Sequence, residues 1–411
     1  MRTGRDLRII TAASEAYDPV CAFDELVAAL DVAVHGPPRK IFLVVASGAD
    51  VRKIYVEAQQ RFPGASIHGS TSCLGLMTES SLLLESGHAL GALAIWDAEG
   101  SYGSAARSID SDARVVAAET TQAALRSAHR SGEVPDLVWM TAAPGHEEAS
   151  LAGIKDVLGD RVLIVGGSSA DNDLKGNWAQ FSREDLCSEG IVISVLFPGS
   201  KVSSVFQSGY APRGPSGIAT KTVGRRLFEI DDRPAAEVYF NWVGGDPPTI
   251  PAHETSTSIL SEATLVPLGV VQHELVDVPL HLLLHPAVMH DDGSLSLFCD
   301  VKQGDMLYLM EGTSRRLLER AGKFASQAKA DAEARRLEVR GALVVYCGGC
   351  MLSVKSDMEQ VRKGIASALP GIPFLGFFSY GEQGATLTGT TQHANLMISC
   401  TVLTSRMSVA S

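Results

Sequence analysis

Short, continuous runs of Val, Ile, Leu and Ala recur along the chain, and most are followed by polar stretches of helix length. Three segments share one order of elements: an apolar strand, a helix, a turn, and a second strand that ends in a Gly- or Ser-rich loop. Their first strands are expected at residues 41–48, 137–145 and 342–350. A further apolar strand follows each segment, at residues 88–96, 190–197 and 393–403. Because runs that are apolar at every position are typical of strands buried on both faces, the pattern predicts a repeated strand–helix–strand unit.

The predicted fold is therefore α/β (mixed α+β), with repeated strand–helix–strand units in mixed sheets that are covered by helices. A long, turn-rich insert at roughly residues 201–340 separates the second unit from the third. We place a domain boundary near residue 200, which gives two tightly associated halves at residues 1–200 and 201–411. Whether the three units share one sheet or form several is left open.

Gly-rich loops follow the second strand of each unit, where open α/β sheets commonly bind ligands. Backbone can approach a ligand closely there because glycine has no Cβ. Tight turns alone would explain any one loop, but their recurrence at three equivalent places favours a shared cleft. The ligand-binding candidates in these loops are Ser70, Ser72, Gly167, Ser168, Tyr380, Glu382 and Gln383.

Two charged residues suggest what such a ligand would carry. Glu382 could accept a hydrogen bond from a ligand amine or act as an acid or base. Arg213, in a turn-rich stretch of the insert, could hold a carboxylate or propionate as a bidentate fork. Each could equally be a solvated loop residue.

The sharpest local motif is Cys347-Gly-Gly-Cys350, which lies between a predicted strand and a predicted helix. A helix N-terminus favours the thiolate, so a Cys-x-x-Cys pair in this place can be redox-active. Small residues selected for close packing would explain it as well. The chain has no second Cys-x-x-Cys, so a zinc site of that type is not expected. Cys347, Gly349 and Cys350 are therefore candidates for binding a ligand.

Histidines provide the metal candidates. His393 opens the last strand, in the place that His88 holds in the first unit, and each could bind haem or a metal, or form a strand-end hydrogen bond. We name His393 as the metal candidate. Four further histidines lie between residues 273 and 290, but no HExxH motif accompanies them, and their segment fits a strand at least as well as a helix.

Composition excludes several classes of protein. The 411 residues include 35 Lys and Arg against 47 Asp and Glu, and a net charge of −12 gives no general attraction to nucleic acid or anionic lipid. No apolar run approaches the ~20 residues that span a bilayer, and the first residues lack the apolar core of a secretory signal. We expect a cytoplasmic protein with no nucleic-acid or membrane partner. Walker, GxSxG and GxGxxG motifs are absent, so whether the chain is an enzyme stays uncertain, and a non-enzymatic role is favoured.

The sequence resembles the FIST family of sensory proteins from about residue 25 to residue 403. The matching stretches include IHGSTSCLGLM, VGGSSADN, CGGCMLSVKSDM, PFLGFFSYGEQG and HANLMIS. The resemblance implies a FIST N-type and a FIST C-type half and a small-molecule ligand. Where many members have Arg shortly after the first cysteine of the motif, this chain has Cys350, which weakens an acidic-ligand contact there and strengthens a thiol-based one.

Three functions follow from the residues and the resemblance. Some bacterial members look like haem-binding nitric-oxide sensors that act on a partner histidine kinase or cyclic-di-GMP enzyme; His393, His88 or Cys347 would then be the axial ligand. An amino-acid-like ligand would use Arg213 and Glu382. A cysteine-dependent enzyme or thiol redox sensor would use Cys347 and Cys350. The chain carries no kinase segment, so signalling is expected to pass through a separate partner protein; a homodimer is one option for its assembly.

Overall fold

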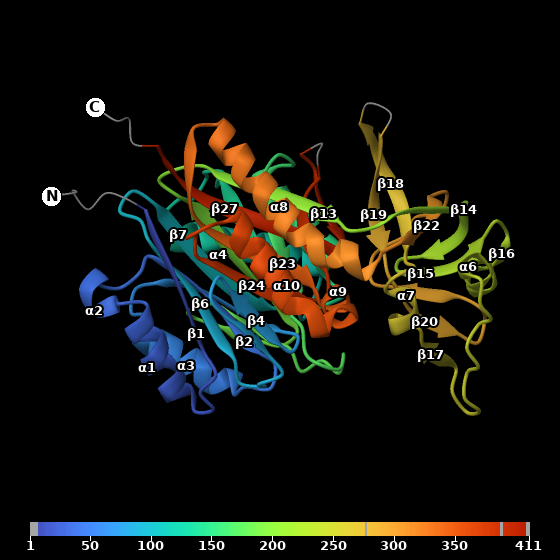
Figure 1. The fold of residues 1–411 in the computed structure, drawn as a ribbon, viewed down its shortest axis with the longest axis horizontal. Helices are drawn as coiled ribbons and strands as arrows, with labels where there is room; N and C mark the ends of the chain where they lie inside the picture. Colours follow the sequence, from blue (N-terminus) through green and yellow to red (C-terminus); the bar gives the residue numbers. More distant parts are fainter. Residues whose placement is uncertain (1–6, 276–277, 387–388, 408–411) are drawn as a thin grey trace.

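Three six-stranded sheets form the body of the molecule, and a fourth sheet forms a lobe at one end (Figure 1). The computed structural model describes residues 7–275, 278–386 and 389–407. Each predicted strand–helix–strand unit is present at the centre of a sheet of its own. In every unit the two linked strands are parallel, and the strand that follows them is antiparallel. The mixed α/β prediction is confirmed.

The first sheet contains the first unit, in which α3 links two parallel strands. Its strand order is β1-β6-β2-β3-β10-β11, and β2 is buried at every position. Helices α1 and α3 cover its outer face through an apolar cluster around Phe23 and Ile54. The elements are β1 (Arg8–Ser14), α1 (Pro19–Ala29), α2 (Val32–His35), β2 (Lys40–Ala46), α3 (Val51–Arg61), β3 (Ser66–Ser72), β6 (Leu90–Trp96), β10 (Gln180–Phe181) and β11 (Leu186–Cys187).

The second sheet contains the second unit, in which α5 links the parallel strands. Its order is β26-β25-β9-β8-β12-β7, so two strands from the C-terminal part of the chain extend it. Helices α4 and α5 pack on its outer face. The elements are β7 (Ser101–Ser108), α4 (Ala113–Ser127), β8 (Leu137–Ala142), α5 (Glu147–Leu158), β9 (Ile164–Gly167), β12 (Gly190–Phe197), β25 (Glu382–Ala385) and β26 (Thr391–Ala394).

The third sheet contains the third unit, in which α9 and α10 lie between the parallel strands. Its order is β13-β27-β23-β24-β4-β5, and helices α8 and α10 pack against each other and cover its outer face. The elements are β4 (Gly75–Thr78), β5 (Leu82–Leu84), β13 (Val202–Ser208), α8 (Ser314–Ala334), β23 (Leu337–Cys347), α9 (Gly348–Ser353), η1 (Lys355–Asp357), α10 (Met358–Ala368), β24 (Phe374–Ser379) and β27 (Met397–Arg406).

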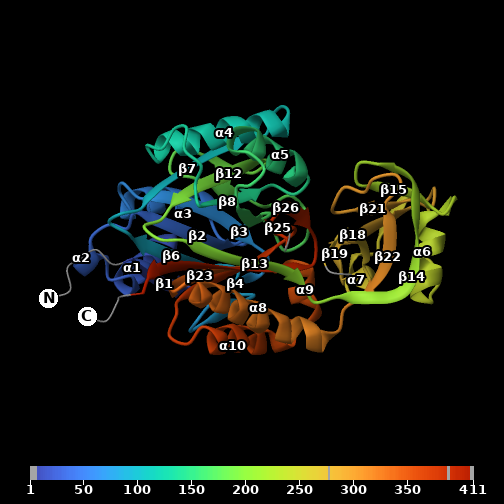
Figure 2. The same ribbon diagram turned by 90° about the horizontal axis from the view of Figure 1, so that it is seen from above.

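Exchanged strands tie the two halves of the chain together. Strand β4 leaves the first half to pair with β24 and is itself paired with β5, and β25 leaves the second half to pair with β9. The inner faces of all three sheets meet in one core, where Trp139 lies 5.7 Å from Phe42 and 6.2 Å from Phe377 between ring centroids. The helices therefore lie on the outside of the body (Figure 2). None of the described helices is long and apolar enough to cross a membrane.

The lobe is formed by residues 211–311, which fall inside the predicted insert. The segment that holds His281 is a strand, one of the two predicted alternatives, and His285 directly follows it; the lobe sheet has nine strands. The stretch 244–261, predicted as a loop, also contains β17 and the start of α7. The elements are β14 (Ala211–Val223), β15 (Arg226–Ile230), β16 (Arg233–Pro234), α6 (Ala235–Val243), β17 (Ser256–Ser258), α7 (Leu260–Ala263), β18 (Leu268–Leu275), β19 (Val278–Leu284), β20 (Pro286–His290), β21 (Leu295–Leu297) and β22 (Met306–Glu311).

Candidate functional site

The loops that follow β3, β9 and β24 meet at one end of the body. Cys73 N donates to Phe378 O at 3.1 Å, and Ala170 N donates to Thr71 O at 3.2 Å. Ser168 N donates to Gly381 O at 2.7 Å. Each loop is therefore hydrogen-bonded to the next, so the ends of the three parallel strand pairs converge, as open α/β sheets arrange their ligand sites.

A pocket of about 230 Å³ lies between this junction and the lobe; we call it the Cys347 pocket. Its walls come from residues 172–174 of the first half, from the lobe, and from residues 347–395 of the second half. Two larger hollows, of about 560 and 410 Å³, lie away from the junction of the three loops. The residues lining the Cys347 pocket are Asn172, Asp173, Leu174, Leu260, His285, Phe298, Cys347, Gly349, Leu352, Ser379, Tyr380 and Asn395.

The buried carboxylate of Asp171 shapes one wall of the pocket. It accepts hydrogen bonds from four backbone N–H groups between residues 173 and 177, at 2.7–3.3 Å. Tyr380 OH also donates to the Asp171 carbonyl at 2.6 Å and to its carboxylate at 3.2 Å. Burial opposes ionisation of Asp171, but these hydrogen bonds outweigh it and hold its pKa below the usual value. The loop that presents Asp173 and Leu174 is thus fixed from beneath.

Cys347 lies on the floor of the pocket, at the N-cap of the short helix α9. Its side chain is 5% exposed and contacts that of Cys350, and both thiols are free. The hydrogen bond with Cys350 and burial raise the pKa of Cys347 well above its usual value. Cys347 therefore faces the pocket as a neutral thiol near pH 7, not as the thiolate that nucleophilic or redox chemistry requires.

Glu382 lies behind the pocket, fully buried. Its carboxyl group accepts hydrogen bonds from Ser379 Oγ at 2.6 Å and from Met397 N at 2.9 Å. Burial and the neighbouring Cys347 raise the pKa of Glu382 well above its usual value. Glu382 is not among the residues that line the pocket. A ligand would contact Ser379, whose hydroxyl group is hydrogen-bonded to Glu382.

Asn395 and His285 form the side of the pocket next to the lobe. Asn395 Oδ1 accepts hydrogen bonds from Cys299 Sγ at 2.8 Å and from His285 N at 3.3 Å. The His285 ring is buried and contacts Leu260 O at 3.1 Å through Nε2. Burial lowers the pKa of His285 to about 4, so the ring is neutral near pH 7.

A charged cluster lies beside the pocket, where α5, β26 and the lobe meet. Arg225 contacts Glu147 Oε2 at 2.7 Å, and it also contacts Glu148. Glu147 accepts a hydrogen bond from Ser168 Oγ at 2.5 Å. Burial opposes ionisation of Glu147, but His393, when protonated, and Arg225 outweigh it and lower its pKa to about 2. This cluster joins the body to the lobe.

The FIST N domain matches residues 40–233 of the chain, and the FIST C domain matches residues 235–385. The chain belongs to the FIST family. FIST domains are associated with sensory signalling and with the binding of small ligands. No curated protein matches this FIST chain.

Solved structures resemble the FIST chain only distantly. Cyanuric acid hydrolase from A. caulinodans is 11% identical, with a TM-score of 0.32 over 49% of this chain and 72% of that chain. A second cyanuric acid hydrolase structure is 13% identical, with a TM-score of 0.28 over the same shares. T. maritima PurL complexed with AMPPCP is 10% identical, with a TM-score of 0.23 over 74% and 72%. Likenesses this weak carry no functional argument.

The predicted site residues separate into three groups. Cys347, Gly349 and Tyr380 line the pocket, and Cys350 and Glu382 lie directly behind it. The group in the charged cluster consists of Ser168, Gln383 and His393. The group that lies elsewhere consists of Ser70, Ser72, Gly167 and Arg213.

The residues outside the pocket have structural contacts of their own. Ser72 Oγ donates to Gly75 O and accepts from Phe378 N, and Gly167 lies where a Cβ would meet Ser379 at 2.8 Å. Ser70 is buried in β3. Arg213 is half-exposed on the lobe, 3.6 Å from Glu311. The contacts of Ser72 and Gly167 stabilise the junction, and that of Arg213 lies on the lobe surface.

The histidines between residues 273 and 290 do not converge on one site. His281 packs edge-on against Tyr308 at 5.1 Å between ring centroids, and His290 Nε2 contacts Ser296 Oγ at 2.7 Å. The side chain of His273 lies outside the described part of the chain. Of the described rings, that of His285 alone lines the Cys347 pocket.

Sequence reasoning missed the contribution of the lobe to the pocket. Leu260, His285 and Phe298 all come from the lobe and carry no motif. Asn395 lies in the stretch HANLMIS and Asn172 in VGGSSADN, both of which carry the family resemblance, but neither asparagine was predicted as a ligand-binding residue. Their positions depend on how the lobe packs against the body, which no local pattern encodes.

Haem does not fit the pocket that the described residues form. A volume of about 230 Å³ is below the roughly 300–1,000 Å³ typical of pockets for drug-sized ligands, and haem is larger than most of those. His393 is not a lining residue, and its ring nitrogens contact Gln383 Nε2 at 3.1 Å and Phe298 O at 3.4 Å. His88 is also outside the lining and packs against Tyr17. Haem binding stays a prediction from the resemblance that this geometry does not favour.

Proposed function

We propose that this FIST protein is a sensor for a small molecule that binds in the Cys347 pocket. The observation that carries the proposal is the position of the pocket: the segments that follow β9, β23 and β24 in the body, together with Asn395, form one side, and the lobe forms the other. A ligand that contacts both sides stabilises the arrangement in which they are close. It thereby shifts the balance between arrangements of lobe and body, which a partner protein can read.

The lining limits the chemistry of the ligand. Leu174, Leu260, Phe298 and Leu352 supply apolar surface, and Ser379, Tyr380 and Asn395 supply polar groups. The lining includes one acidic residue, Asp173, and no Lys or Arg. A ligand of amino-acid size with an apolar body and an amine or amide head fits these groups. A ligand carboxylate would meet no cation there, because Arg213 lies elsewhere on the lobe.

The sequence predicts an amino-acid-like ligand. This proposal keeps compounds of that size that carry an amine or amide and disfavours those that carry a free carboxylate. The cysteine-dependent alternatives are less well supported, because the raised pKa of Cys347 keeps its sulfur protonated. A thiol can still donate a weak hydrogen bond to the ligand. Nitric oxide, a partner kinase and a cyclic-di-GMP enzyme stay predictions from the resemblance.

The test is a thermal-shift series with leucine, leucinamide and isopentylamine. A ligand at 100 times its Kd stabilises the folded protein by about 2.7 kcal/mol, which is readily measured. We expect leucinamide or isopentylamine to raise Tm and leucine to have a smaller effect. A response to leucine that equals or exceeds the others would refute the charge argument.

A matched pair of glycine variants locates the binding site. A Cβ at Gly349 would lie in van der Waals contact with Leu396 Cδ2 at 3.4 Å, His285 Cε1 at 3.6 Å and Cys347 Sγ at 3.8 Å, so Gly349→Ala reduces the pocket without a clash. Gly364→Ala is the control, because its Cβ would meet nothing closer than 3.9 Å in α10, away from the pocket. We expect the ligand-induced shift to fall in Gly349→Ala and to persist in Gly364→Ala. Equal shifts in both would place the ligand elsewhere.

A further inference from the structure

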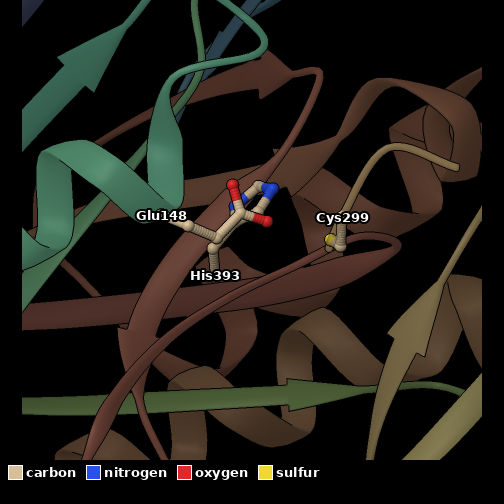
Figure 3. A group of neighbouring side chains, drawn as sticks. All are labelled: Glu148, Cys299 and His393. Atoms are coloured by element: carbon tan, nitrogen blue, oxygen red, sulfur yellow. The ribbon is translucent and has the colours of Figure 1, made fainter. Parts of the chain in front are cut away.

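Glu148, Cys299 and His393 bring three metal-binding atoms together in the charged cluster, although they are far apart in the sequence. A carboxylate oxygen, a sulfur and an imidazole nitrogen lie within 4.8 Å of one another. Figure 3 shows the Glu148 carboxylate next to the His393 ring, with the Cys299 sulfur facing them. A zinc ion with bonds of 2.0–2.3 Å holds its ligand atoms about 3.3–3.8 Å apart. Side-chain movements of about an ångström would therefore complete the set.

We propose that these three residues bind a divalent cation of the zinc class. Thiolate, imidazole and carboxylate are all ligands of Zn²⁺, and a site with three protein ligands keeps a position for water or for a further group. The carbonyl oxygen of Phe298, 3.4 Å from His393 Nε2, lies beside that position. On binding, the Cys299 thiol gives its proton to solvent and the sulfur forms the bond to the metal.

Each ligand residue can offer a lone pair to the metal, His393 when its proton lies on Nδ1. Glu148 Oε1 accepts a hydrogen bond from Asp300 N at 2.9 Å, and its other oxygen contacts Arg225, but a carboxylate has about four acceptor sites. His393 is contacted at Nδ1 by Gln383, so Nε2 is the nitrogen that faces the metal position. Cys299 is a free cysteine.

Two buried amides next to the ligands, those of Gln383 and Asn395, can reorient around a bound metal. Among the described residues, Gln383 Oε1 and Asn395 Nδ2 are buried without a hydrogen-bond partner. Amide oxygen and nitrogen exchange places when the group rotates by half a turn. After rotation, Gln383 Oε1 accepts from His393 Nδ1–H, which is how metal-binding histidines are held. Asn395 Nδ2 then donates to the Cys299 thiolate, at the expense of the 3.3 Å bond from His285 N.

The charge of the cluster also suits a cation. Arg225 contacts the carboxylates of Glu147 and Glu148, and its Nε lies 3.8 Å from Asp300 Oδ1. One guanidinium thus faces three carboxylates. A divalent cation at Glu148 would balance the remaining negative charge, which a buried cluster otherwise has to bear.

The metal would join three parts of the chain. Glu148 belongs to α5, His393 to β26, and Cys299 to the lobe segment that follows β21. Phe298 and Asn395, which line the Cys347 pocket, are next to Cys299 in the chain and in space, respectively. The ion would therefore hold the lobe against the body beside the pocket, yet its binding does not depend on the proposed ligand.

The test uses the full-length protein freed of metal with a chelator and titrated with Co²⁺, then with Zn²⁺. We expect one Co²⁺ per chain, with a thiolate-to-cobalt charge-transfer band that Zn²⁺ abolishes. Cys299→Ser should remove the band, and Glu148→Gln should weaken Co²⁺ binding by at least about 10-fold, as losses around metal ligands do. Cys347→Ser is the control and should retain both the band and the affinity.

The opposite results would overturn the proposal. They are a protein that binds less than half an equivalent of Co²⁺, or a band that persists in Cys299→Ser and disappears in Cys347→Ser. If Cys299→Ser fails to fold, X-ray absorption of the zinc-loaded wild-type protein decides. One sulfur with nitrogen and oxygen ligands supports the site, and a shell without sulfur, or with several, rejects it.

Discussion

Glu382→Gln probes the buried carboxyl group that supports the pocket. The folded pKa of Glu382 is raised well above 4.5 by burial and by Cys347, so the folded state holds a proton that the unfolded state releases. Wild-type stability from this group is fully present below pH 4.5 and is lost as pH rises through the folded pKa. The loss amounts to about 1.4 kcal/mol per pH unit in that window. A glutamine has no such proton, and its amide oxygen can still accept from Met397 N.

We therefore expect Glu382→Gln to gain stability relative to wild type as pH rises, by about 1.4 kcal/mol between pH 5 and pH 6. Urea unfolding at half-unit pH steps from 4.5 to 8 measures the difference, in which the other titrating groups cancel. The pH at which the difference levels off reports the folded pKa. The exposed Glu254→Gln is the matched control for the loss of a carboxyl group at the surface. A flat difference for Glu382→Gln would refute the claim that the buried group is protonated.

Three further predictions concern backbone, thiols and acid. Gly75→Ala should destabilise the protein by about 3 kcal/mol or more in urea unfolding, because φ is +151° and a Cβ would lie 1.8 Å from Leu83 O; a loss under 1 kcal/mol would contradict this geometry. Iodoacetamide at pH 7 should label exposed Cys21 and spare Cys73, whose pKa burial raises to about 12; equal labelling by mass spectrometry would show that the junction opens. Burial lowers the pKa of His285 to about 4, so the unfolded state binds the extra proton and the contribution of His285 to stability should fall by about 3 kcal/mol from pH 6.5 to 4. His285→Gln should reduce that fall, and an unchanged pH profile would exclude His285 as its source.

The sequence allowed the three units to be predicted because their strands are buried on both faces. Strand β2, for example, is buried at every position, which gives an unbroken apolar run. The exchange of strands between sheets could not be predicted. Strands β4 and β25 have four residues each, and their pairing partners lie hundreds of residues away or in another unit. Such pairing depends on the packed body rather than on local pattern.

The candidate site was predictable only on the side formed by motifs. Cys347 and Tyr380 belong to conspicuous Gly-rich or cysteine-containing stretches, whereas Phe298 and Leu260 are ordinary apolar residues of the lobe. Arg213 shows why charge alone does not locate a site. A lone arginine in a turn-rich stretch suggested a carboxylate receiver, but its strand places it on the lobe surface beside Glu311. A charged residue in a sequence indicates what it could bind, but not which cavity its side chain faces.

The most direct test of the central claim is a crystal structure of the protein with isopentylamine or leucinamide, whichever gives the larger thermal shift. The account predicts density for the ligand in the Cys347 pocket, with its apolar part against Leu260 and Phe298 and its nitrogen near Asp173, Ser379 or Asn395. Density in another hollow, with the Cys347 pocket empty, would contradict it. So would a thermal series in which neither compound shifts Tm at millimolar concentration.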